Sequence, residues 1–278
     1  MNKQRLIHFC SSASGGRGAK RRGNLIYFLV MAFLCNTCVN GVELGTEPTD
    51  TTGEIGRVGL KAGVEYLDGR QLEFTQGPEI DRRLVKLPYI GFDIGLGERA
   101  DIQADFDVIY LDEEGRDNKY GVGDLRLWNK IKFINEGEYL PSMGFRWGVK
   151  LPNANYEDRL GTDETDFFSS FLFSKHINNI YSHVNLGMGI LGNPDKTNEQ
   201  DDVLVYGVGG VYPISDVINT VLEVNGYAGS NDNNNFSSLL LGFQIKMNEA
   251  VWDLGWRFGL TDESEDWGVR TGIRWMVR

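Results

Sequence analysis

The strongest constraint on this chain is an alternation of apolar and polar residues, which recurs in segments of about 9 to 13 residues. In the stretch "DIQADFDVIYL", Ile102 and Phe106 share one parity, whereas Asp101, Asp105 and Asp107 share the other. A period of two is typical of a β-strand, because successive side chains point to opposite faces. Each such segment therefore predicts a strand with one apolar face and one charged face.

About twelve segments of this kind follow one another to the end of the chain. Strands of soluble proteins average about 5 to 6 residues, whereas strands that cross a membrane need about 9 to 11. The segment lengths therefore favour membrane-crossing strands. They start near Arg57, Leu84, Asp101, Tyr120, Tyr139, Asp166, Ile180, Val203, Val217, Phe236, Ala250 and Trp267.

The connections between these segments alternate between long and short. "DGRQLEFTQGPEIDRR", "DEEGRDNK" and "PNANYEDRLGTDET" are long, whereas "GERA", "NEGE" and "PISD" are short. Up-and-down outer-membrane barrels have short turns at one end, long loops at the other and an even number of strands. The sequence therefore predicts an all-β fold, a transmembrane up-and-down antiparallel β-barrel of about twelve strands over residues 55–278. Its apolar face meets lipid and its polar face lines a lumen.

Residues 1–41 contain six basic residues, no acidic ones and the apolar run "LIYFLVMAFL". This run of ten is too short for a spanning helix, which needs about 20 residues. We predict a cleaved signal peptide at 1–41, an N-terminal periplasmic linker at 42–54 and location in the cell outer membrane of a Gram-negative-type bacterium. Without the leader, 22 basic residues face 39 acidic ones, which argues against a nucleic-acid partner.

Strand parity assigns one set of charged side chains to the lumen. Two interpretations remain open, a salt-bridged interior that stiffens the wall and a charged constriction that selects solutes. The segment Asp68–Arg83 is the longest candidate for a plug or gate. The predicted lumen-lining residues are Asp105, Asp107, Asp124, Arg126, Lys130, Arg146, Lys150, Glu223, Arg257, Arg270 and Arg274.

Two strand candidates, "DFFSSFLFSK" and "VLVYGVGGVY", carry apolar residues at both parities. Either an inward loop covers their inner face, or the lumen is apolar there. We expect no enzyme, because His176 and His183 are the only histidines after the leader and His183 has lumen parity. No metal or cofactor is expected, since the acidic loops "DEEGRDN" and "GSNDNNN" lack the ligand spacing of a dedicated calcium loop.

Several segments between Gly121 and Gly226 resemble the outer-membrane β-barrel family of the MetA pathway of phenol degradation. They are "GVGDLRLWNKIKF", "GVKLPNANYEDRLGTDETDFFSSFLFSK" and "VNLGMGILGNPDK", followed by "VLVYGVGGVYPISDVINTVLEVNG". The terminal "RTGIRWMV" is similar to the assembly signal of such barrels, although Arg278 follows it where an aromatic residue is usual. The residues of this signal are Arg270, Gly272, Trp275 and Val277.

This resemblance implies passive or facilitated transport of small solutes, apolar or aromatic compounds among them, through the lumen. It also implies outer-membrane lipid, the barrel-assembly machinery and periplasmic chaperones as partners, while the solute itself is unknown. The alternative is a closed barrel that transports nothing and serves as a structural or surface scaffold.

Overall fold

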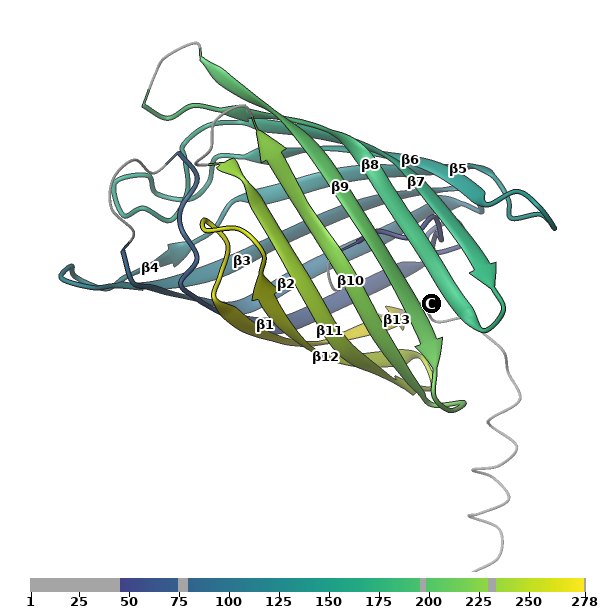
Figure 1. Cartoon of the computed structure of the whole chain (residues 1–278). Coiled ribbons are helices and arrows are strands. Elements are labelled where there is room, and N and C mark those ends of the chain that lie inside the picture. Colours follow the sequence, from purple (N-terminus) through teal and green to yellow (C-terminus); the bar gives the residue numbers. More distant parts are fainter. Residues whose placement is uncertain (1–45, 75–79, 196–198, 230–233, 278) are drawn as a thin grey trace, which may run out of the picture. The chain divides into compact units, whose positions relative to one another are not determined.

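The computed structural model describes residues 46–74, 80–195, 199–229 and 234–277. The predicted signal peptide at 1–41, the first residues of the predicted linker and Arg278 lie outside the described residues. The described part of the chain forms one antiparallel sheet that closes on itself (Figure 1). Closure depends on β1 (Val58–Asp68), which pairs with both β2 (Arg82–Gly97) and β13 (Trp267–Val277).

Every other strand pairs with its neighbours in sequence, as an up-and-down barrel requires. A closed ring leaves no strand edge, so each ladder hydrogen bond finds a partner within the wall. The remaining strands are β3 (Ala100–Glu113), β4 (Lys119–Val122), β5 (Leu125–Ile134), β6 (Ser142–Leu151), β7 (Asp166–Ile177), β8 (Ile180–Gly192), β9 (Gln200–Pro213), β10 (Ile218–Gly229), β11 (Phe236–Met247) and β12 (Ala250–Gly259).

β4 and β5 together make one strand of the barrel, because both pair with β3. The interruption lies at Gly123 and Asp124. There the N–H of Gly123 still donates to the carbonyl of Asp107 at 2.8 Å, while the register shifts by one residue. The ring therefore has twelve strands, and the predicted twelve-strand antiparallel barrel is confirmed.

The strict alternation of inward and outward side chains is interrupted within β2. Between Lys86 and Tyr89 the pairing with β3 shifts register, so that Leu87 and Pro88 form a bulge. Proline has no N–H for the ladder, which is why it occurs at bulges rather than in regular paired strand. Both Lys86 and Tyr89 consequently point inward, although they differ in parity.

The two faces of the wall differ as the alternation predicts. On β3, Ile102 and Tyr110 are exposed outward, whereas Asp101 and Asp107 are at most 2% exposed on the inner side. Among the described residues, no helix has both the length and the apolar character needed to cross a membrane.

Connection lengths sort by end as predicted, with one exception, because the connection 135–141 is longer than the connection 114–118 at the opposite end. Turns at 98–99, 135–141, 178–179, 214–217 and 248–249 occupy one end, which we call the short-turn end. The connections after β1, β3, β6, β8, β10 and β12 gather at the other, the long-loop end (Figure 1).

Candidate functional site

The interior of the barrel at the short-turn end holds residues 46–54, which we call the strap. Thr46, Glu47, Thr49 and Thr52 are at most 5% exposed. Their hydrogen-bond partners lie at inner positions of six strands, namely β3, β5, β6, β7, β8 and β10. From Thr46 on, the segment predicted as a linker therefore lies against the inner wall, and nothing in its sequence pattern indicated this.

The carboxylate of Glu47 is the charged anchor of the strap. Its Oε1 lies 2.5 Å from Nζ of Lys130 and accepts a hydrogen bond from Gln103 at 3.1 Å. Its Oε2 lies 3.5 Å from the guanidinium of Arg146. Lys130 and Glu47 are almost fully buried, so each charge depends on the other for its stability.

The backbone of the strap is also bound by side chains of the wall. The amide of Asn185 accepts from the N–H of Glu47 at 2.8 Å and donates to its carbonyl at 2.7 Å, as a neighbouring strand would. Further along, the N–H of Thr49 donates to Ser174, and Thr52 donates to a buried aspartate of β3. Buried polar backbone needs such partners, and the inner wall supplies them.

Two glycines of β9 make room for the first residue of the strap. A Cβ at Gly207 would lie 2.5 Å from Cγ2 of Thr46. A Cβ at Gly209 would lie 2.6 Å from Nε2 of His183 and 2.9 Å from Oγ1 of Thr46. The glycine-rich "GVGGV" therefore fits the wall to the strap.

We predict that Gly209→Ala loosens the strap, because the new methyl group overlaps with Thr46 and His183. Overpacking typically costs about 1 to 3 kcal/mol, so amides of residues 46–52 should exchange with deuterium about tenfold faster or more. Gly210→Ala is the matched control, because its Cβ points outward and meets only Ile180, at 3.3 Å. Equal exchange in the two variants would contradict the fitted wall.

Residues 69–74 turn into the barrel at the long-loop end, and we call them the loop plug. Phe74 is 4% exposed and packs between Leu191 and Val203 on the inner wall. Its N–H donates to Oδ1 of Asn234 at 3.0 Å. The plug belongs to the predicted segment Asp68–Arg83, and it packs on apolar inner residues of the two strands with apolar residues at both parities, Phe168 of β7 and Val203 and Val205 of β9. At this end of the two strands, the interpretation of an inward loop is the one the structure supports.

A carboxylate fixes the loop plug as well. Glu73 accepts a hydrogen bond from the hydroxyl of Tyr227 at 2.5 Å and lies 3.8 Å from Lys150. Burial raises the pKa of Glu73, but the charge of Lys150 and the bond from Tyr227 hold it below its ordinary value. The Glu73 carboxylate therefore stays ionised at neutral pH.

A second long loop also turns inward, between β6 and β7. Ala154 and Leu160 are buried against a cluster of aliphatic side chains from β1, β2 and β3. Asp124 holds the start of this loop, because its Oδ1 accepts from the N–H groups of Asn153 and Ala154 at 3.0 and 2.9 Å. Segments of the chain itself thus lie inside the barrel near both of its ends.

The eleven predicted lumen residues are all buried or half-buried. Eight of them form described ion pairs, and Lys150 by itself contacts three carboxylates. Glu223 lies 3.5 Å from Nε2 of His183. Asp105 lies opposite Arg126 in the β3–β5 pairing, and Arg270 stacks on Tyr89. Whether these residues line a path for solute stays a prediction, as does the assembly signal.

Sequence reasoning missed part of one buried cluster. Asp93 on β2 lies 3.0 Å from Lys61 and 2.8 Å from Arg274, and its side chain is 1% exposed. The sequence predicted Arg274 as a lumen residue. Asp93 faces inward only because the bulge at Leu87–Pro88 shifts the alternation for the residues that follow it in β2. The strap partners His183 and Asn185 have inner parity and were available to the same reasoning.

The closed ring and the sorted connections define the fold of an outer-membrane β-barrel. An outer membrane channel from Pseudomonas putida F1 is similar, with 12% identity and a TM-score of 0.60, over 86% of this chain and all of that one. The translocator domain of the autotransporter NalP from Neisseria meningitidis has 13% identity and a TM-score of 0.50, over 81% and 89%. At these sequence identities, the similarity shows the fold alone.

No protein-family model and no curated protein sequence matches the chain. The resemblance to the MetA-pathway family therefore stays a prediction.

Proposed function

We propose that this protein is an outer-membrane channel through which small solutes cross by passive or facilitated diffusion. The observation that carries the proposal is the way the interior is filled. The strap and the loop plug are short segments bound by ion pairs and hydrogen bonds, and the wall leaves space for the strap with glycines. Such segments withdraw without unfolding the barrel, whereas a lumen filled by wall side chains has nothing to withdraw.

The proposed solutes are small apolar or aromatic compounds, in keeping with the MetA-pathway resemblance. The similar structure from Pseudomonas putida F1 is itself a channel of the outer membrane. We place the short turns and the strap on the periplasmic side and the long loops outside. Export by the signal peptide and insertion by the barrel-assembly machinery, with periplasmic chaperones, belong to the same proposal.

Uptake by intact cells tests this function. A Gram-negative host that expresses the chain should take up limiting phenol faster than the same host without it, while uptake of a bulky hydrophilic sugar should stay the same. Whole cells are required, because phenol crosses a simple phospholipid bilayer unaided.

The dense ion pairing inside the barrel favours a second candidate, a closed scaffold that transports nothing. An opened variant distinguishes the two functions. It lacks residues 46–52 and carries Phe74→Asp, which expels the loop plug. If this variant conducts no ions and wild-type cells gain no uptake, the scaffold is the better description.

We predict that Arg146 and Lys150 set the ion preference of the opened variant. Reversing both charges to glutamate should shift the permeability ratio toward cations by about threefold or more, because rings of side-chain charge select ions in narrow pores. Reversal potentials in asymmetric salt measure this ratio. Arg83→Glu is the control, since that side chain is 56% exposed on the outer parity. An unchanged ratio would remove Arg146 and Lys150 from the selective site.

A further inference from the structure

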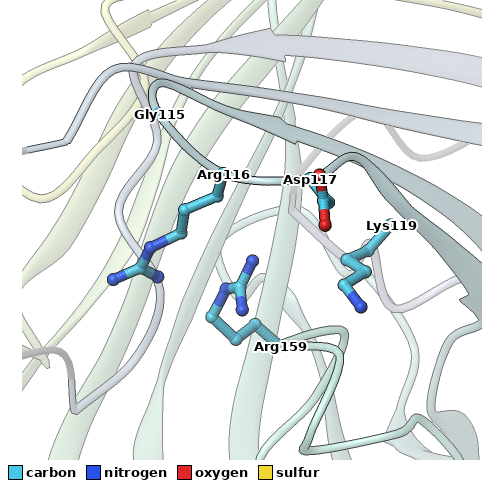
Figure 2. A pocket seen from close by; sticks show the side chains of 5 residues that line it. All are labelled: Gly115, Arg116, Asp117, Lys119 and Arg159. Atoms are coloured by element: carbon cyan, nitrogen blue, oxygen red, sulfur yellow. The ribbon is translucent and has the colours of Figure 1, made fainter.

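A basic pocket opens at the long-loop end, between the β3–β4 hairpin and the inward loop after β6. Its volume is about 590 Å³, and Gly115, Arg116, Asp117, Lys119 and Arg159 line it. Figure 2 shows Arg116, Asp117 and Lys119 on the β3–β4 hairpin and Arg159 on the loop opposite, with their side chains on the two sides of one space. We call it the mouth pocket. Its size is in the range of pockets that hold small molecules, about 300 to 1,000 Å³.

The mouth pocket lies on the inner side of the hairpin. In β4, Lys119 pairs with Leu111, a residue fully buried on the inner face of β3. Tyr120, the next residue, has the opposite parity and is 77% exposed. Leu160 of the inward loop lies against Gly121 on the same inner face. The pocket therefore faces solutes that arrive at the mouth rather than the surrounding lipid.

Glu113 is buried beneath the two lining arginines and positions their guanidinium groups. Its Oε2 accepts from Nε of Arg159 at 2.5 Å and lies 3.5 Å from Nη1 of Arg116. A guanidinium has five N–H donors in a planar fork. Because Glu113 engages Arg159 through Nε, and no described residue bonds its two terminal nitrogens, the fork of Arg159 stays available.

The backbone of Arg159 supports a dedicated role for this side chain. Its φ is 60°, a left-handed conformation that residues other than glycine seldom adopt. Residues held in such conformations cluster at functional sites and ligand clamps. In this conformation, the side chain of Arg159 reaches Glu113 and lines the pocket.

The lining of the pocket is richer in cations than in carboxylates. Arg116, Lys119 and Arg159 line it together with one carboxylate, that of Asp117. Two further carboxylates lie next to the lining cations, because Glu113 is buried beneath the arginines and Asp158 binds Lys119 at 2.8 Å. A cationic lining with carboxylates close by suits a ligand of low negative charge.

We propose that the mouth pocket binds a small organic monoanion through its carboxylate, with the forked nitrogens of Arg159 and the guanidinium of Arg116 as donors. Planar carboxylates fit a guanidinium fork in a bidentate way. Within the proposed function, on which this role rests, the pocket concentrates acidic aromatic solutes at the entrance. Binding itself is measurable whether or not the barrel transports.

Titration calorimetry on the detergent-purified chain tests the proposal, with sodium benzoate as the probe and benzyl alcohol as its neutral counterpart. We expect benzoate to bind, benzyl alcohol not to bind, and added NaCl to weaken the benzoate interaction. Arg116→Gln and Arg159→Asn should each weaken benzoate binding by about fivefold or more. Asparagine is chosen because it tolerates a positive φ, and Arg116 is exposed enough to change without harm to the fold.

Arg99→Gln is the matched control, because Arg99 is an exposed arginine in the turn at the opposite end. Benzoate binding that is unchanged in both pocket variants, or equal binding of benzyl alcohol, would overturn the site. Tighter binding of inorganic phosphate than of benzoate would overturn the assignment to carboxylates. If expression of the chain gives no gain in phenol uptake while benzoate still binds, the proposed function is rejected and the site stays in place.

Discussion

Release of both closing segments is expected to raise the single-channel conductance by about tenfold or more over release of either one alone. The strap and the loop plug close opposite ends of one path, and resistances in series add. Deletion of residues 46–52 therefore leaves the loop plug limiting, and Phe74→Asp leaves the strap limiting. An aspartate at position 74 cannot remain buried between Leu191 and Val203, although its backbone tolerates the φ of 57° found there.

Planar-bilayer recordings of the two single variants, the double variant and the wild type measure this effect. Tyr156→Asp is a suitable control, because it places the same charge on a more exposed aromatic residue at the same end. If the strap deletion alone gives the conductance of the double variant, the loop plug is no barrier and the series arrangement is wrong.

Loss of the charge on Glu47 is expected to detach the strap while the barrel stays folded. In Glu47→Gln, the buried Lys130 and the half-buried Arg146 both lose the carboxylate of Glu47, which lies 2.5 Å and 3.5 Å from their nitrogens. Removal of one partner of a buried ion pair costs about 3 to 5 kcal/mol. Amides of residues 46–52 should then exchange about a hundredfold faster, since each 1.4 kcal/mol is worth a factor of ten.

Hydrogen–deuterium exchange resolved by peptide measures this effect separately for the strap and the strands. Glu54→Gln removes the same charge from an exposed position in the same segment and should leave the exchange of the strap unchanged. Faster exchange throughout the strands of Glu47→Gln would show that Glu47 holds the barrel and not only the strap. Wild-type exchange rates in Glu47→Gln would show that the carboxylate is not the anchor.

The alternation of side chains predicted the strands almost completely. Eleven of the predicted starts fall within three residues of the observed ones, and the predicted strand from Tyr120 corresponds to β4 and β5. The exceptions have local causes. At Leu87–Pro88 a bulge adds a residue to β2, and at Gly123–Asp124 a register shift divides one strand in two. A periodic pattern carries no information about such an extra residue.

The sequence by itself determined the wall, because the position of each strand residue relative to lipid or lumen depends on parity, a property of the chain's own order. The contents of the lumen were decided only by the tertiary structure. The strap, the loop plug and the pocket have no periodicity, and their partners lie far away in sequence, as Glu47 and Asn185 do at a separation of 138 residues. Closure of the ring brings such groups within bonding distance, and no local pattern encodes which of them will meet.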